Sequence, residues 1–281
     1  MDMSRTISDY LRRIGADRPA APDAAALRDL QVRHLRTVPF ENLSVHLAEE
    51  IVLEERALVA KVVDRRRGGF CYELNGAFAV LLRELGFRVT LLQARVFTSD
   101  GRLGIPYDHM TLLVETPSPD GAGGDGERWL ADVGFGSHST HPLAFDERGD
   151  QEDPAGTFRV VEAPEGDLDV LRDGKPQFRL DRRPRALADF AAGAWYHRTS
   201  PESHFTRSLV CSRNTHDGRI TLGGHRLVTT ADGERHEREL TGDAEILATY
   251  RERFGLVLDR VPRVMPHQRK EGTNWTSGTC G

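Results

Sequence analysis

The chain has 281 residues, of which 38% are hydrophobic, and its 38 lysines and arginines against 43 aspartates and glutamates give a formal net charge of −5. This composition excludes a disordered or fibrous chain, because there is enough apolar surface to bury a core. The mildly acidic balance also argues against a nucleic-acid partner, since general nucleic-acid binders carry a basic footprint.

Targeting and redox signals are weak in this chain. No run of about 18 consecutive apolar residues occurs, so we expect no membrane-spanning helix. The amino-terminal stretch is amphipathic, unlike the continuous apolar core of a signal peptide. Three cysteines, Cys71, Cys211 and Cys280, are too few and too scattered for a disulfide framework or a metal site, and they favour the reducing cytoplasm. Nothing in the pattern predicts an oligomeric state.

The first ninety residues predict helices. Apolar residues at helical spacing indicate one helix over residues 7–14, a second that Asp23 can cap, and a third around residues 58–63. A fourth helix should begin near Cys71 and end at Gly86, which fits the left-handed residue that terminates many helices.

After Gly86 the chain changes to short apolar runs bounded by turn residues, which predict strands. The expected strands are Phe87–Phe97, Thr111–Glu115, Trp129–Val133, Thr157–Val161, Asp169–Arg172, Gln177–Asp181, Ser208–Ser212, Arg219–Leu222 and Arg226–Thr229. The glycine- and proline-rich residues 117–126 predict a flexible surface loop. Helical patterns return near Pro184 and over Asp243–Phe254, so the predicted class is α+β.

The densest chemical signal is the segment Arg67–Gly76. Two glycines, Gly68 and Gly69, allow a sharp turn, and Cys71 follows at a helix start. The unpaired N–H groups and the dipole of a helix start favour a negative charge, which would favour the nucleophilic thiolate. A buried structural cysteine is the alternative interpretation of the same placement.

A thiolate nucleophile needs a base, and His109 is the strongest candidate among 11 histidines because it opens an apolar strand just after Pro106. A histidine at a strand end can be held rigidly while it faces a cleft. The alternative is an ordinary exposed histidine in a turn. The competing histidines lie in polar stretches that lack such a scaffold: His197, His204 and His216.

The base in turn needs an orienting carboxylate. Asp132 interrupts the apolar segment Trp129–Val133, where an unpaired carboxylate is costly. A histidine on a neighbouring strand would compensate that cost, although an aspartate bonding the adjacent glycine turn remains the alternative. Asp108 is the rival orienter for His109, but adjacent strand residues point to opposite faces.

Two groups of segments resemble the arylamine N-acetyltransferase family. The first comprises Val38–Leu43 and Arg67–Asn75. The second comprises the strand that begins at His109, Asp132–Gly136 and Thr199–Phe205. The resemblance covers residues 38–205 and places a Cys71, His109 and Asp132 triad in the family's order.

This resemblance implies a cysteine-protease-like core: a helical first domain over residues 1–90, a β-barrel over 91–183 and an α/β third domain over 184–281. It also implies acetyl-CoA as the donor cosubstrate, an aromatic amine or hydrazine as the acceptor, and no metal. The residues implied near the coenzyme are Gly134, Phe135, Gly136 and Phe205. Those implied near the acceptor are Phe40 first, with Phe70 and Tyr72 as weaker candidates, and plain core packing is the alternative for all three.

Two other functions are compatible with the same triad. One is an amide synthase of polyketide biosynthesis, which closes a macrolactam from a carrier-bound acyl chain, and the arginine-rich composition suits a source in which such enzymes occur. The other is a cysteine hydrolase of the papain or transglutaminase type. All three triad positions are occupied, which disfavours a non-catalytic binding module.

Overall fold

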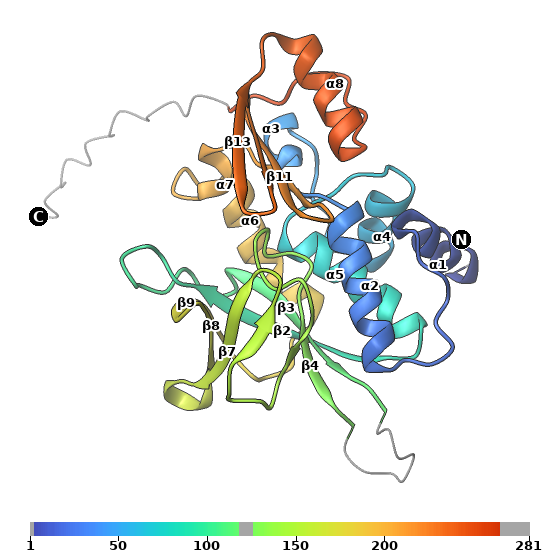
Figure 1. Ribbon diagram of the computed structural model, residues 1–281, viewed down its shortest axis with the longest axis vertical. Coiled ribbons are helices and arrows are strands. Elements are labelled where there is room, and N and C mark those ends of the chain that lie inside the picture. Colours follow the sequence, from blue (N-terminus) through green and yellow to red (C-terminus); the bar gives the residue numbers. More distant parts are fainter. Residues whose placement is uncertain (1–2, 118–125, 265–281) are drawn as a thin grey trace, which may run out of the picture.

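The computed structural model describes residues 3–117 and 126–264. Its first part is a bundle of four main helices, α1 (Met3–Ile14), α2 (Ala24–Thr37), α4 (Glu55–Val63) and α5 (Cys71–Glu84) (Figure 1). The predicted helices are therefore confirmed. Asp23 caps α2 by accepting a hydrogen bond of 2.8 Å from the amide of Ala26, and Gly86, with φ of 95°, follows α5 in the left-handed region.

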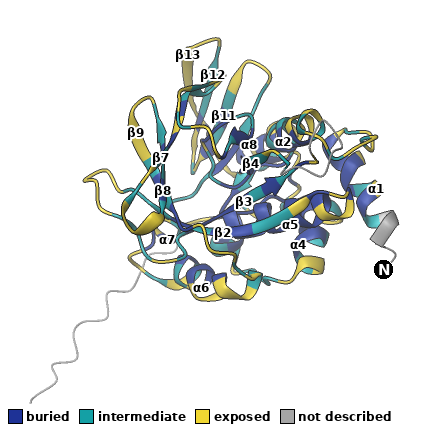
Figure 2. Cartoon of the chain, turned by 90° about the horizontal axis from the view of Figure 1, so that it is seen from below, coloured by how far each residue is buried: buried dark blue, intermediate teal, exposed yellow. Residues whose placement is uncertain are grey.

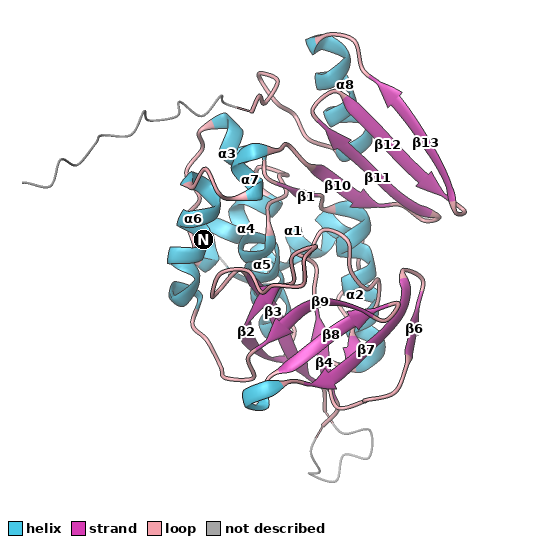
Figure 3. Ribbon diagram, turned by 90° about the vertical axis from the view of Figure 1, so that its left-hand side faces the viewer, coloured by secondary structure: helices cyan, strands magenta, loops and turns pink. Residues whose placement is uncertain are grey.

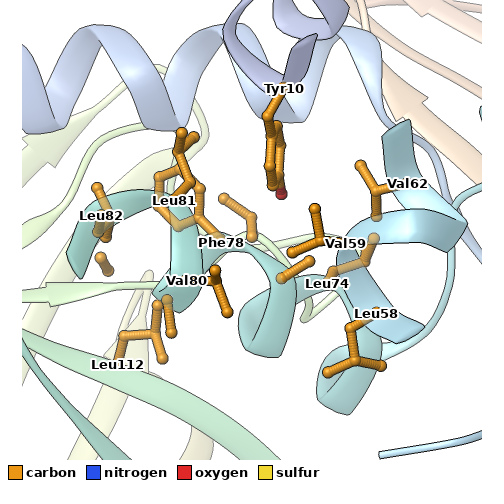
Figure 4. Packing of buried hydrophobic residues seen from close by; sticks show 14 of the residues in the cluster. Tyr10, Leu58, Val59, Val62, Leu74, Phe78, Val80, Leu81, Leu82 and Leu112 are labelled. Carbon is orange, nitrogen blue, oxygen red and sulfur yellow. The ribbon is translucent and has the colours of Figure 1, made fainter. Parts of the chain in front are cut away.

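Helix α5 lies at the centre of the largest buried cluster. Its residues Leu74 and Phe78 pack with Tyr10 of α1 and Val59 of α4, and Leu112 of the neighbouring sheet closes the cluster from the other side (Figure 4). Figure 2 shows the buried residues gathered where the helices meet the sheet. Because α5 is buried along most of its length, it holds its first residue, Cys71, in a fixed position.

A curved antiparallel sheet of eight strands packs against α5 in the strand order β5-β4-β3-β2-β9-β8-β7-β6 (Figure 3). The strands are β2 (Arg88–Val96), β3 (His109–Glu115), β4 (Arg128–Ala131), β5 (Leu143–Ala144), β6 (Gln151–Asp153), β7 (Gly156–Glu162), β8 (Leu168–Arg172) and β9 (Lys175–Leu180). The six strands predicted in this region are confirmed. A second buried cluster, which includes Leu92, Phe158 and Phe178, fills the concave side of the sheet.

The carboxy-terminal part forms a five-stranded sheet on which α8 (Asp243–Phe254) packs. Its strands are β1 (Phe40–Glu41), β10 (Cys211–Asn214), β11 (Gly218–Gly223), β12 (Arg226–Ala231) and β13 (Glu234–Glu239). Strand β1 comes from the amino-terminal part and pairs with β10. Phe40 also forms an isolated parallel bridge with Gly69, so β1 lies beside the segment that leads into α5.

The remaining helices are short, and one predicted strand is shifted near them. They are α3 (Leu43–Leu47), α6 (Ala191–Thr199), α7 (His204–Arg207) and the 3₁₀ turns Pro164–Gly166 and Leu187–Phe190. The strand predicted at Ser208–Ser212 begins only at Cys211, because Asn42 binds the preceding backbone. Its side chain donates to the carbonyl of Ser208 (2.6 Å) and accepts from the amide of Val210 (2.9 Å).

The predicted α+β class is confirmed by this arrangement. None of the helices in the described residues is long and apolar enough to cross a membrane. Most of the loop predicted at 117–126 lies outside the described residues, as does Cys280. The division into domains at residues 90 and 183 stays a prediction.

Candidate active site

Cys71 is the first residue of α5, and close backbone packing holds it there. Neither Gly68 nor Gly69 has a positive φ, so the chain does not use the left-handed region at these two glycines. A Cβ atom on Gly68 would lie 1.9 Å from the carbonyl oxygen of Pro39, and one on Gly69 would lie 2.6 Å from Oε2 of Glu73. These positions therefore need glycine because neighbouring atoms approach the chain too closely for a side chain.

A buried ion pair supports the start of α5. Glu73 accepts a hydrogen bond from the amide of Phe70 (3.3 Å) and pairs with Nζ of Lys61 at 2.5 Å. Burial raises the pKa of Glu73, and the lysine offsets this only in part. Lys61 also donates to the hydroxyl of Ser44 at 2.8 Å. Sequence reasoning did not assign this pair. The sequence feature that could have indicated the pair is Lys61 itself, a lysine inside an apolar helical segment of a chain whose other basic residues are mostly arginines.

His109, at the start of β3, faces Asp132, which follows β4. Nε2 of His109 lies 2.6 Å from Oδ2 of Asp132, and both side chains are buried. Nδ1 therefore remains available to Cys71, whose side chain is close enough to raise the pKa of His109 and whose Sγ lies 4.0 Å from the carbonyl oxygen of the preceding residue, Asp108. The structure thus brings together the three residues that the sequence predicted as a triad.

The electrostatics of this pair favour its charged form. Burial alone would lower the pKa of His109, but the Asp132 carboxylate and the Cys71 side chain outweigh burial and raise it to about 10. Burial would likewise raise the pKa of Asp132, but His109 outweighs it and the pKa falls to about 2. The imidazolium is therefore held close to the cysteine at neutral pH.

The shifted pKa values of His109 and Asp132 predict how the stability of the fold and the protonation of His109 depend on pH. The raised pKa of His109 adds stability that is fully present below its ordinary value of 6.5 and is lost as pH rises through about 10. The lowered pKa of Asp132 adds stability that is present above 3.8 and is lost as pH falls through about 2. We expect histidine ¹⁵N NMR to show His109 still protonated at about pH 8, more than one unit above its ordinary pKa. A neutral His109 ring at that pH would contradict this assignment.

Asn75 connects the nucleophile helix to the His109 and Asp132 strands. Its Nδ2 donates to Oδ1 of Asp132 (3.0 Å) and to the carbonyl of Met110 (2.6 Å), while its Oδ1 accepts from the amide of Val133 (2.9 Å). The amide of Gly134 donates to the same Asp132 oxygen at 2.8 Å. With these donors and His109, both carboxylate oxygens of Asp132 are held. Sequence reasoning had not assigned Asn75, although an amide four residues after Cys71 on an apolar helix was a usable signal.

Gly134 packs directly against the nucleophile. A Cβ atom at Gly134 would lie 2.7 Å from Cα of Cys71 and 2.8 Å from Nδ2 of Asn75. Gly134→Ala should therefore displace Cys71 and lower the kcat/KM of acetyl transfer about 100-fold, the cost of a displacement of about 1 Å in a reacting group. Steady-state kinetics would measure it, with Gly149→Ala as the control, because Gly149 is exposed and its Cβ would meet only the end of Glu147. Equal kinetics for the two variants would show that the contact has no effect on the nucleophile.

Asp108, the rival candidate for the carboxylate that orients His109, pairs with a different histidine. Oδ1 of Asp108 lies 3.0 Å from Nε2 of His197 on α6, and its Oδ2 accepts from the amide of Val96 at 3.2 Å. The sequence interpretation of His197 as lacking a scaffold is wrong, because this histidine is buried and its Nδ1 also contacts the hydroxyl of Ser203 at 3.0 Å. The other competing histidine sites, His204 and His216, lie on α7 and in the turn after β10.

The aromatic residues named from the sequence cluster beside the triad. The Phe205 ring lies 6.0 Å from that of Phe40 and 5.7 Å from that of Phe70. Phe40 and Phe205 are half-buried, whereas Phe70 and Tyr72 are at most 1% exposed. Tyr72 donates its hydroxyl hydrogen to the carbonyl of Tyr107, with an O···O distance of 2.6 Å. Phe70 and Tyr72 are therefore core residues in this structure.

The turn after Asp132 forms another wall of the site. Phe135 packs edge-on against the ring of His109, with centroids 5.1 Å apart. Gly136 has a positive φ of 86° and lies against Phe40, since a Cβ atom there would come within 3.2 Å of that ring. Among the described residues, no group of three or more histidine, cysteine or acidic side chains is arranged to hold a metal ion.

Comparisons with known proteins agree with this geometry. A family model described as N-acetyltransferase matches residues 23–263. The arylamine N-acetyltransferase of Escherichia coli (strain K12) is 36% identical over 265 residues, covering 92% of this chain and 91% of that protein. The solved structure of the M. smegmatis arylamine N-acetyltransferase is similar with a TM-score of 0.80 and 35% identity, covering 89% of this chain and 92% of the other.

A further solved structure, of the Mycobacterium marinum arylamine N-acetyltransferase in complex with CoA, matches with a TM-score of 0.79 and 31% identity, over 89% of this chain and 92% of that one. The matches cover nearly the whole of each chain and include the segments that carry Cys71, His109 and Asp132. This chain belongs to the arylamine N-acetyltransferase family.

Proposed function

We propose that this chain transfers the acetyl group of acetyl-CoA to an aromatic amine or hydrazine through an acetyl-cysteine at Cys71. The observation that carries the proposal is the buried arrangement of Cys71, His109 and Asp132, with the cysteine at a helix start. Family membership supports the donor and the acceptor class. Cys71 and Cys211 are both free thiols, which suits the reducing cytoplasm expected from the sequence.

The first half-reaction forms the acetyl-enzyme. The Cys71 thiolate attacks the thioester carbonyl, a new S–C bond forms, and the bond from the carbonyl carbon to the CoA sulfur breaks. The imidazolium of His109 supplies a proton to the leaving thiolate. N–H groups at the start of α5 are well placed to stabilise the oxyanion, because they have no partner within the helix.

The second half-reaction returns the enzyme to its starting state. The amine attacks the acetyl-cysteine, the C–S bond to Cys71 breaks, and His109 takes the proton that the amine loses. Asp132 keeps Nε2 of His109 protonated in both steps, so Nδ1 is the nitrogen that exchanges the proton. Asn75 and the amide of Gly134 prevent the carboxylate from turning away.

We assign the half-buried aromatic residues to substrate contacts. Phe40 would line the acceptor pocket, while Phe205 and the turn Gly134–Gly136 would contact the coenzyme. The support for this is their packing against one another and against His109. Phe70 and Tyr72 would not contact substrate and instead support these residues from the core. Phe70 packs against the Phe205 ring, and Tyr72 hydrogen-bonds to the backbone just before His109.

Phe40→Ala should raise the amine KM and leave the acetylation of Cys71 nearly unchanged. The ring is half-buried and borders Gly136 and Phe205, and an aromatic contact contributes about 0.5–1.5 kcal/mol beyond its buried area. We therefore expect kcat/KM for the amine to fall at least about threefold. Stopped-flow acetylation and steady-state amine kinetics would separate the two effects. Equal slowing of both half-reactions would show that Phe40 only supports the fold.

A panel of amines tested with acetyl-CoA would distinguish this function from its alternatives, with free CoA as the readout. An arylamine N-acetyltransferase releases CoA in proportion to a reactive aromatic amine, and its double-reciprocal plots at several amine concentrations are parallel. A cysteine hydrolase would release CoA at a rate that does not depend on the amine. An amide synthase would react poorly with acetyl-CoA and prefer a long carrier-bound acyl chain. Either of these last results would overturn the proposal.

A further inference from the structure

The turn that leads into His109 contains a residue in an unfavourable backbone conformation. Tyr107 has a φ of 60°, in the left-handed region that residues other than glycine rarely adopt. A residue of this kind persists only where its surroundings hold it, and such residues cluster at functional sites. Tyr107 stands two residues before His109, the first residue of β3. The groups that hold this turn therefore also hold the start of β3.

Groups from three elements fix the backbone of Tyr107. Its amide donates to Oε1 of Gln93 on β2 at 3.1 Å, and its carbonyl accepts the hydroxyl hydrogen of Tyr72 on α5. Helix α6 packs on the same carbonyl, because a Cβ atom on Gly193 would lie 2.6 Å from its oxygen. Helix α6 is thus in direct contact with the turn.

The next residue, Asp108, connects this turn to the nucleophile. Its carbonyl oxygen lies 4.0 Å from Sγ of Cys71. Its carboxylate is held at both oxygens: Oδ2 accepts from the amide of Val96, and Oδ1 lies 3.0 Å from Nε2 of His197. A movement of the carboxylate would displace the carbonyl beside Cys71 and, with it, the residue that follows, His109.

His197 joins Asp108 to α7. Its Nδ1 lies 3.0 Å from Oγ of Ser203, and this oxygen also accepts from the amide of Phe205 at 3.2 Å. The rings of His197 and Phe205 are nearly perpendicular, with centroids 5.2 Å apart. Ser203 is 2% exposed and caps α7, so its hydroxyl is not available as a second nucleophile. The histidine therefore serves to connect α6 and α7 with the start of β3.

We propose that His197 is a positioning residue for the transfer reaction. Through its contact with Asp108 it holds the turn that sets Cys71 and His109 relative to each other. Without this contact, the unfavourable conformation of Tyr107 would relax and the carbonyl beside Cys71 would move. The kinetic consequence rests on the proposed function, whereas the placement of Cys71 can be measured without it.

Two amides at position 197 separate the contacts of this histidine. His197→Gln brings an N–H group near the position of Nε2 and keeps a contact with Asp108. His197→Asn is shorter, reaches only the position of Nδ1 and keeps the contact with Ser203. Both remove the ring, so each variant controls for the packing that the other loses, and circular dichroism melting verifies that both are folded.

Three measurements compare these variants on the full chain. Stopped-flow acetylation of Cys71 reports the first half-reaction, and steady-state kinetics with a reactive arylamine give kcat and the amine KM. The rate at which iodoacetamide alkylates Cys71, located by peptide mapping, reports the placement of the nucleophile without acetyl-CoA.

We expect His197→Asn to lower kcat about tenfold, the size of one hydrogen bond to a charged group. Both half-reactions should slow, the amine KM should stay nearly unchanged, and alkylation of Cys71 should slow in parallel. His197→Gln should restore most of these rates. Equal rates in the two variants, or a loss confined to the amine KM, would overturn the positioning role. If the unsubstituted chain transferred no acetyl group, the proposed function would fail, while slower alkylation in His197→Asn than in His197→Gln would still support the role of His197.

Discussion

Asp132→Asn should lower kcat/KM by about 10⁴-fold, the loss seen when the orienting aspartate of a serine-protease triad is replaced by its amide. The asparagine side chain would present either its NH₂ group or a weaker acceptor to Nε2 of His109. In the unsubstituted chain this nitrogen lies 2.6 Å from Oδ2 of Asp132. The ring would then favour the tautomer that cannot accept a proton at Nδ1. Steady-state acetyl transfer to a reactive arylamine measures the effect, and circular dichroism verifies the fold.

Asp108→Asn is the matched control for this substitution. Asp108 precedes His109 directly, but its carboxylate pairs with His197 and not with His109. We expect a much smaller loss from this variant, confined to the packing of α6 against the start of β3. If the Asp108 variant were the more damaged of the two, the orienting carboxylate would be misassigned.

Cys71→Ala should abolish acetyl transfer and leave the fold intact. Alanine keeps the helix start and removes only the nucleophilic sulfur, so the second half-reaction has no acyl group to use. Cys211→Ala is the control, since Cys211 is fully buried in the core under the five-stranded sheet and burial raises the pKa of its thiol. Release of CoA with a reactive arylamine measures both variants. Activity that survives in Cys71→Ala would mean direct transfer from the donor to the amine.

Periodicity predicted most of the fold because most elements bury one face. The helices over residues 7–14 and at Cys71, and the strands of the larger sheet, each show a regular apolar pattern. Strand β13 (Glu234–Glu239) escaped prediction because every one of its residues is exposed, and its pairing with β12 depends on backbone hydrogen bonds that the side chains do not reveal. Strand β10 was placed too early because Asn42, far away in sequence, binds the backbone before it.

The candidate site was predicted in part for similar reasons. Cys71, His109 and Asp132 each stand out from their local pattern, so the sequence named them as candidates, and the structure places them together. Asn75 and Lys61 act through partners distant along the chain, and their roles appear only after folding.

Intact mass spectrometry after incubation with acetyl-CoA, without any amine, tests the central claim most directly. We predict the addition of one acetyl group, located on Cys71 by peptide mapping, and its removal when a reactive arylamine is added. Cys211 and Cys280 should stay unmodified. An unmodified chain that still acetylates arylamines, or an acetyl group on either of the other cysteines, would contradict the account.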